Sequence, residues 1–113
     1  MKTSIEKPSK DFLIKINDVH KRVKLEEVFC LQSEGKYVSL ILENRRYSFR
    51  GTLKQLEQVL PINFVRTHSS FIVNLDKIST IKNQENLITL TNDFELSYSR
   101  KYKDSLFENF LLG

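Results

Sequence analysis

Short apolar or alternating runs, separated by polar turns, extend along almost the whole chain. Runs of this length, rich in Phe, Val, Ile and Tyr, are typical of β-strands, because a half-buried strand alternates apolar and polar residues. The candidate strands are residues 12–16, 23–25, 28–31, 37–42, 47–49, 64–66, 71–75, 78–81, 87–91 and 94–98. The pattern therefore predicts a mainly β chain.

Residues that favour tight turns stand between these runs. Asn17–Asp18 follows the first run, and Asn92–Asp93 separates the last two. Such residues are common in turns because their side chains bond the nearby backbone. Gly35 has the backbone freedom that a tight connection needs, since it has no Cβ. Two pairs of neighbouring runs are predicted to form hairpins, 37–42 with 47–49 and 87–91 with 94–98.

One internal segment follows a helical period instead. Thr52 and Gln55 have the spacing of a capping box, in which two side chains satisfy free backbone N–H groups at a helix start. Apolar residues then recur at helical spacing from Leu53. Pro61 cannot continue the hydrogen-bond ladder of a helix. A short helix is therefore predicted over about residues 52–60.

The end of the chain has a second helical pattern, and Ser99 is its candidate N-cap. Apolar side chains follow on one side of the predicted helix, at Tyr102, Leu106, Phe107, Phe110 and Leu111. A C-terminal helix is predicted over about residues 99–111. No glycine-rich strand–helix motif is present, which argues against a Rossmann unit or a P-loop.

The 113-residue chain has the size of one globular domain. Apolar residues make up 40% of it, and eight Phe and four Tyr provide bulk for a core. Residues 1–10 are predicted to be a polar lead-in or linker, and residues 11–113 the domain. No apolar run approaches the ~18 residues of a membrane span, and the first residues lack a signal-peptide core. We therefore expect no membrane association.

Cys30 is the single cysteine of the chain. One cysteine forms no internal disulfide and builds no metal site alone. Its apolar neighbours predict a buried thiol. Because a chain without disulfides is typical of a reducing compartment, we expect a cytoplasmic location.

No constellation of residues indicates catalysis. The two histidines are His20 and His68. His68 precedes two serines, but adjacent strand residues point to opposite faces, and the nucleophile-elbow motif of serine hydrolases is absent. No pair of His or Cys residues has metal-ligand spacing. The sequence therefore predicts no enzyme activity, no metal and no cofactor.

The chain is moderately basic, with a net charge of +4 and a pI near 9.2. Such a charge is compatible with a polyanionic partner but does not establish one. The basic residues include two clusters, Arg45, Arg46 and Arg50 in the first and Arg100, Lys101 and Lys103 in the second. Either cluster, taken alone, is also typical of a solvated surface.

Three stretches of the chain, taken together and in this order, form a distinctive sequence pattern. Residues 28–38 (VFCLQSEGKYV) combine an apolar strand, a small polar loop and a Tyr-Val strand start. Residues 64–75 (FVRTHSSFIVNL) contain an Arg-x-His-x-Ser-aromatic-Ile-Val-Asn core, and residues 96–102 (LSYSRKY) lead into the last predicted helix. In this order the stretches resemble the LytTR family of DNA-binding domains, over roughly residues 12–112. The middle stretch is the most specific.

The resemblance implies short antiparallel strands in several small sheets, with little helix. It also implies that loops, rather than a recognition helix, enter successive major grooves of double-stranded DNA. Each domain of this family reads one element of an imperfect direct repeat, which is compatible with a dimer on DNA. Family members usually follow a receiver or sensory domain, for which this chain has no room. We therefore expect a free-standing member, or the output domain of a bacterial transcription regulator.

Three positions match the family's base-contacting loops, namely Lys36, Ser69 and Arg100. The Lys36 ammonium suits a guanine edge or a phosphate, with a solvated turn lysine as the alternative. Arg100 has the planar fork for a bidentate guanine contact, with a surface salt bridge as the alternative. Ser69 departs from the Arg or Asn of many members, so a phosphate contact, a water-bridged contact or a plain turn serine is equally compatible with it.

The resemblance also implies supporting roles near these positions. Ser99 has two open interpretations, a phosphate donor or a helix cap. His68 and Asn74 are expected to hold the loop around Ser69 in shape through hydrogen bonds. The expected contacts to the DNA backbone are Arg66, Tyr98, Ser99, Lys101 and Lys103.

Two other binding classes remain open. A protein-interaction module without nucleic-acid specificity is the main alternative, because an exposed strand such as 94–98 can pair with a partner and basic clusters suit an acidic protein. Binding of RNA or single strands through tyrosines is the second, although no RNP-like aromatic motif is present. Competition with heparin or random duplex separates a protein-only binder from a DNA binder.

Overall fold

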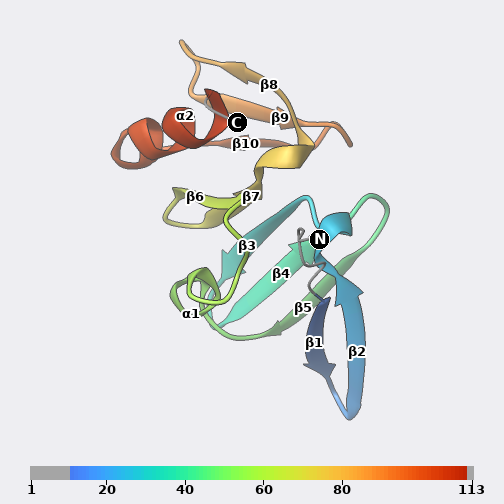
Figure 1. The fold of residues 1–113 in the computed structure, drawn as a ribbon. Coiled ribbons are helices and arrows are strands. Elements are labelled where there is room, and N and C mark those ends of the chain that lie inside the picture. Colours follow the sequence, from blue (N-terminus) through green and yellow to red (C-terminus); the bar gives the residue numbers. More distant parts are fainter. Residues whose placement is uncertain (1–10, 112–113) are drawn as a thin grey trace, which may run out of the picture.

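The fold is given by a computed structural model that describes residues 11–111, with only the backbone described for residues 109–111. Within this range the strands form antiparallel sheets of two, five and three strands (Figure 1). The strands are β1 (Asp11–Ile16), β2 (Val19–Lys24), β3 (Cys30–Glu34), β4 (Tyr37–Ile41), β5 (Arg46–Arg50), β6 (Phe64–His68), β7 (Phe71–Asn74), β8 (Ile78–Lys82), β9 (Leu87–Leu90) and β10 (Glu95–Ser97). The helices are α1 (Leu53–Glu57), α2 (Lys103–Leu111) and the 3₁₀ helices η2 (Leu25–Glu27), η3 (Leu75–Lys77) and η4 (Arg100–Tyr102). The lead-in predicted for residues 1–10 lies outside the described residues.

The five-stranded sheet has the order β5-β4-β3-β7-β6, and its inner strands are buried on both faces, whereas the edge strand β5 leaves one face exposed. Successive residues of a strand point to opposite faces, so each strand supplies both sides. Leu31 and Ile72 are partners in register and face one side, while Cys30 and Val73 face the other. All four are at most 1% exposed. The sheet therefore separates two apolar cores.

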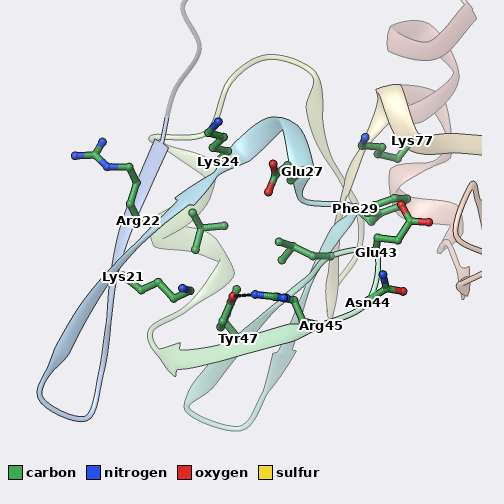
Figure 2. A pocket seen from close by; sticks show the side chains of 12 residues that line it. Lys21, Arg22, Lys24, Glu27, Phe29, Glu43, Asn44, Arg45, Tyr47 and Lys77 are labelled. Atoms are coloured by element: carbon green, nitrogen blue, oxygen red, sulfur yellow. Dashed lines mark hydrogen bonds between the residues drawn. The ribbon is translucent and has the colours of Figure 1, made fainter.

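Each core is closed by a different layer. The β1–β2 hairpin and α1 cover the first, with the buried side chains Ile14, Val23 and Leu53. The β8–β10 sheet and α2, at the top of Figure 1, cover the second. Each large apolar side chain buried in this way contributes roughly 1.5–3 kcal/mol. Beside the first core, β2 and the β4–β5 turn border an open cleft (Figure 2).

The predicted turns are formed by residues in the left-handed backbone region. Asn17, between β1 and β2, has a φ of 56°, and Asp93, between β9 and β10, has a φ of 70°. Asn86 precedes β9 with a φ of 51°, and Gly35 has a φ of 64°. Asn, Asp and Gly adopt this region most readily. Local turn chemistry therefore sets the hairpins, and the mainly β prediction is confirmed.

The capping box predicted for α1 is present. The Gln55 N–H donates to Thr52 Oγ1, and the Thr52 N–H donates to Gln55 Oε1, both at 3.2 Å. The α-helix ends at Glu57, earlier than predicted. The last turn tightens, and the Val59 N–H donates to the Leu56 carbonyl three residues back. Pro61 follows directly and disfavours helical backbone at the residue before it.

The C-terminal helix begins later than predicted. Residues 100–102 form η4, and α2 starts at Lys103. The Ser99 side chain makes no capping hydrogen bond, so Ser99 is not a side-chain cap. Leu106 is fully buried, whereas the side chains of Phe110 and Leu111 lie outside the described residues. In the part of the chain that the structure describes, no helix has the length and apolar character to cross a membrane.

Candidate nucleic-acid interface

Three loops lie next to one another on one side of the molecule. They are the β3–β4 turn, the β6–β7 turn and the segment leading into α2 (Figure 1, left). The Ser33 N–H donates to the Ser70 carbonyl, which joins the first loop to the second, at 2.9 Å. The Ser99 N–H donates to the Thr67 carbonyl, which joins the third to the second, also at 2.9 Å. The structure thus brings together the three loops in which the sequence predicts base contacts.

Lys36 lies at the tip of the β3–β4 hairpin. Glu34 and Tyr37 pair across the hairpin, which leaves Gly35 and Lys36 as a two-residue turn. The Lys36 carbonyl accepts a hydrogen bond from the Gly51 N–H at 3.1 Å. Its side chain is exposed. The backbone of the tip is therefore fixed while the ammonium stays in solvent.

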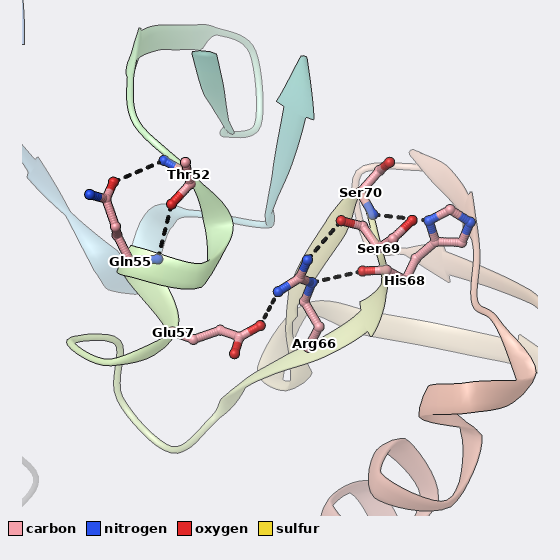
Figure 3. A network of polar contacts seen from close by, with 7 residues as sticks. All are labelled: Thr52, Gln55, Glu57, Arg66, His68, Ser69 and Ser70. Carbon is pink, nitrogen blue, oxygen red and sulfur yellow. Dashed lines mark hydrogen bonds and ion pairs between the residues drawn. The ribbon is translucent and has the colours of Figure 1, made fainter. Parts of the chain in front are cut away.

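One guanidinium holds the β6–β7 turn in shape (Figure 3). Arg66 Nε donates to the His68 carbonyl and Nη2 donates to the Ser69 carbonyl, both at 2.8 Å. Its Nη1 forms an ion pair with Glu57, the last residue of α1. The guanidinium carbon also lies 5.9 Å from the ring centroid of Tyr102 in η4. A single side chain therefore links α1, the turn and η4.

These contacts give Arg66 a role that the sequence did not predict. Its side chain is 21% exposed, and three of its N–H groups donate inside the molecule. Arg66 is thus a positioning residue for the turn, and its contact with a phosphate stays a prediction. No local signal reveals the pairing with Glu57, because the partners are nine positions apart and belong to a helix and a strand.

His68 closes the same turn from the other side. The Ser70 N–H donates to His68 Nδ1 at 3.0 Å, and this bond spans Ser69. The His68 ring packs edge-on against Phe71, with 5.7 Å between centroids. This geometry agrees with the scaffold role predicted for His68. Ser69 itself is exposed at the tip of the turn.

Asn74 is a scaffold residue, but at the opposite end of β7. It is 1% exposed, and its Nδ2 donates to the Val28 carbonyl at 2.9 Å. Its Oδ1 accepts hydrogen bonds from Asn63 Nδ2 and the Asp76 N–H, both at 3.0 Å. These bonds tie β7 to the chain before β3 and to η3. The prediction that Asn74 holds the loop around Ser69 is therefore wrong in its location.

The segment before α2 presents a row of cations. Arg100, Lys101 and Lys103 are all exposed. Within residues 11–111, none of them forms an ion pair, so the salt bridge considered for Arg100 is not made there. Lys101 Nζ lies 5.4 Å from the ring centroid of Tyr102. Within the described residues, the charges of this row therefore face solvent without an ion-pair partner.

Tyr98 and Ser99, just before this row, differ in exposure. Tyr98 is 2% exposed and packs edge-on against Phe107, with 6.0 Å between centroids. Its hydroxyl is buried and has no hydrogen-bond partner in the described part of the chain. A phosphate needs an accessible donor, so this burial argues against the DNA contact predicted for Tyr98. Ser99 is partly exposed, and its phosphate contact stays a prediction.

Strand β5 divides the first basic cluster of the sequence. Arg50 pairs with Tyr37, next to the β3–β4 turn, whereas Arg46 pairs with Ile41 at the far end. At ~3.3 Å per residue the two arginines stand roughly 13 Å apart along the strand. Arg50 therefore lies at the same end of the sheet as Lys36. We call this side of the molecule, where the three loops meet, the loop edge. Sequence reasoning missed this position because only the register shows at which end of a strand a residue lies.

The edge has the chemistry of an anion-binding surface. Lysine and arginine side chains neutralise phosphates, and the arginine fork also fits a guanine edge. Within residues 11–111, no three His, Cys, Asp or Glu side chains are grouped as a metal site. The exposed cations of the edge are Lys36, Arg50, Arg100, Lys101 and Lys103.

Comparison with known proteins gives the family. Residues 12–110 match the family profile of the LytTr DNA-binding domain. The chain belongs to the LytTR family. This match confirms the resemblance seen in the three stretches. It also supports the prediction that this LytTR domain is not an enzyme, because the family is one of DNA-binding regulators.

Two curated relatives and one solved structure are similar to this LytTR domain. It is 35% identical over 81 residues to the sensory transduction protein LytT of Enterococcus faecalis, covering 68% of this chain and 34% of that protein. It is 36% identical over 72 residues to the accessory gene regulator protein A of Staphylococcus aureus, covering 62% of this chain and 30% of that protein. The chain thus spans about a third of the length of these relatives. A LytTr DNA-binding domain from Bacillus cereus has the same fold, with a TM-score of 0.78 at 24% identity over 91% of this chain and 97% of that chain.

Proposed function

We propose that this LytTR domain binds double-stranded DNA sequence-specifically, through the three neighbouring loops, as the output part of a bacterial transcription regulator. The observation that carries the proposal is the arrangement of these loops. Lys36, Ser69 and Arg100 are exposed, and backbone hydrogen bonds hold their loops side by side. The names of LytT and of the accessory gene regulator support a role in regulation.

In the proposed complex, some residues contact the bases and others contact the phosphates of the DNA backbone. Arg100 makes a bidentate contact with a guanine in the major groove, and Lys36 contacts a second base or a phosphate. Ser69 makes a water-bridged or phosphate contact, because its short hydroxyl distinguishes bases poorly. Phosphate contacts fix the register of the protein on the duplex but carry no sequence information. They are assigned to Arg50, Ser99, Lys101 and Lys103.

Two observations suggest the partners. The LytTR resemblance implies binding to direct repeats, and the chain spans about a third of the length of its relatives. We infer that each domain reads one element of an imperfect direct repeat, so that two copies bind side by side on DNA. In a longer regulator, a receiver or sensory domain would accompany this output domain. A cytoplasmic location, where DNA lies, agrees with this role.

Selection of bound duplexes from a random DNA pool, at two salt concentrations, tests the proposed function. We expect enrichment of a short motif that recurs as a direct repeat. Retention that is sensitive to salt but shows no enrichment would mean only electrostatic adhesion. In that case the protein-interaction module would become the better interpretation.

Replacing Arg100 with Ala tests direct readout. We expect the affinity for the selected duplex to fall by ~1–3 kcal/mol and the preference at one base pair to relax, because a bidentate contact is lost. Binding curves on the selected duplex and on single-base variants measure both effects. Lys82→Ala, an exposed cation on β8, is the control for the change in charge. Equal losses on selected and random duplex would make Arg100 a phosphate contact instead.

A further inference from the structure

A concave site, away from the three loops, lies at the β4–β5 turn (Figure 2). It is a cleft of about 620 Å³ that β2, η2, the β4–β5 turn and η3 surround. A volume of this size is within the range of small-ligand and peptide pockets, roughly 300–1,000 Å³. The cations that line the cleft are Lys21, Arg22, Lys24, Arg45 and Lys77.

The cleft has an excess of positive charge. Five cations line it against two carboxylates, Glu27 and Glu43. Arg22 pairs with Asp11, which lies outside the lining, at 3.2 Å. No other cation of the lining forms an ion pair with a residue of the described range 11–111. An isolated protein leaves such a concentration of like charge unsatisfied, and an anionic ligand would relieve it.

Two of the cations, Arg45 and Lys21, lie against the same phenol. Arg45 Nη1 donates to the Tyr47 hydroxyl at 3.0 Å, and Lys21 Nζ lies 5.4 Å from the centre of the Tyr47 ring (Figure 2). The hydrogen bond from Arg45, together with the charges of Arg45 and Lys21, lowers the pKa of the Tyr47 phenol. The cleft therefore already favours a negatively charged oxygen between its two walls.

The lining also contains apolar and acidic side chains. Val23, Phe29 and Leu42 form an apolar part of the wall, and Lys77 Nζ lies 4.9 Å from the Phe29 ring centroid. The carboxylates Glu27 and Glu43 would repel a continuous phosphate backbone, which carries a charge at every nucleotide. A peptide carries its carboxylates at separate residues, so it can place them at the cations and away from Glu27 and Glu43, while an apolar side chain meets the apolar part of the wall. We propose that this cleft binds a short acidic segment of a protein partner.

The cleft is well separated from the loops proposed to contact DNA. Strand β4 runs from Tyr37 beside the loops to Ile41 beside the cleft, a distance of roughly 13 Å at ~3.3 Å per residue. A segment bound in the cleft would leave the Lys36 tip uncovered. The inference therefore goes beyond the proposed DNA contacts and does not depend on them.

Nuclear magnetic resonance titration of the isotope-labelled chain tests this inference. The probe is a synthetic peptide of Asp, Glu and Leu, with random duplex DNA as the second ligand. We expect the peptide to shift the amide signals of Lys24, Asn44 and Arg45 and to leave those of the β6–β7 turn unchanged. The double variant Lys24→Gln/Arg45→Gln is expected to raise the Kd for the peptide about tenfold, through the loss of two ion pairs.

The matched control is Lys54→Gln/Lys82→Gln, which removes the same charge from exposed positions outside the cleft. It should leave the Kd for the peptide within about twofold. An equal loss in both double variants, or peptide shifts at the β6–β7 turn, would overturn the proposal. Displacement of the peptide from the cleft by random duplex would overturn it in favour of a nucleic-acid site. Duplex selection with Lys24→Gln/Arg45→Gln should return an unchanged motif, so the two proposals fail separately.

Discussion

The guanidinium of Arg66 shows what a single residue does at the loop edge. Its planar N–H groups meet two carbonyls of the β6–β7 turn and the carboxylate of Glu57 at once. A lysine ammonium has the same charge but no fork, so it cannot make these bonds together. Exchanging the two residue types therefore separates geometry from charge in this turn.

We expect Arg66→Lys to weaken binding to the selected duplex about tenfold and to leave binding to random duplex nearly unchanged. The carbonyls of His68 and Ser69 would lose their donors, so the turn would no longer be held for readout. Filter binding or fluorescence anisotropy with both duplexes measures the difference.

Lys101→Ala is the informative comparison for Arg66→Lys. Removing this cation should weaken binding to all sequences alike. It should also reduce the slope of log affinity against log salt concentration by about one unit in magnitude. Full retention of specific binding in Arg66→Lys would show that only the charge of Arg66 matters. An unchanged salt slope in Lys101→Ala would remove Lys101 from the interface.

Among the elements, α1 depends on its capping box because it is only one and a half turns long, at 3.6 residues per turn. Thr52→Ala removes the acceptor for the Gln55 N–H and should lower the free energy of unfolding by about 1 kcal/mol. Urea denaturation measures the loss. Lys54→Ala, at an exposed position of the same helix, is the control and should change stability little. Equal stability of Thr52→Ala and the native chain would show that α1 is held by packing alone.

The elements that the sequence predicted well are those with local causes. The turns at Asn17 and Asp93 and the capping box at Thr52 depend on neighbouring residues only. The helix ends were predicted less well. Helix α2 begins at Lys103 and not at the predicted Ser99. The Ser99 N–H instead donates to the Thr67 carbonyl of β6, a tertiary contact that the local sequence does not reveal.

At the scale of the whole molecule, the candidate site depends on contacts between distant parts of the chain. The resemblance marked Lys36, Ser69 and Arg100, but the backbone bonds that place their loops side by side join residues far apart in the sequence. The cleft was missed for the same reason. Lys21, Arg45 and Lys77 come from three different elements and no sequence motif connects them.

The stability of the whole molecule is expected to depend on pH through Cys30. Burial raises the pKa of this thiol from 9.0 to about 12, against a smaller opposing effect of Arg46. Below pH 9 the thiol is protonated in both the folded and the unfolded chain. Above pH 9 only the unfolded chain releases the proton, so the free energy of unfolding falls until the pH approaches 12.

Between pH 8 and pH 10 this loss should be on the order of 1 kcal/mol. Urea denaturation at both pH values, with native chain and Cys30→Ala, isolates it from other titrating groups. The variant is less stable at either pH but should lack this part of the pH dependence. The same pH dependence in both proteins would mean that the thiol ionises within the fold.

The division of the central sheet into two buried cores has an evolutionary consequence. The side chains that hold the cores are at the sheet faces, whereas Lys36, Ser69 and Arg100 protrude at one rim. Mutation at such solvent-facing positions usually changes stability by less than about 0.5 kcal/mol. The rim can therefore diverge between duplicated copies while the scaffold is retained. Under the proposed function, a single ancestral fold can in this way supply one bacterium with several regulators that do not cross-react.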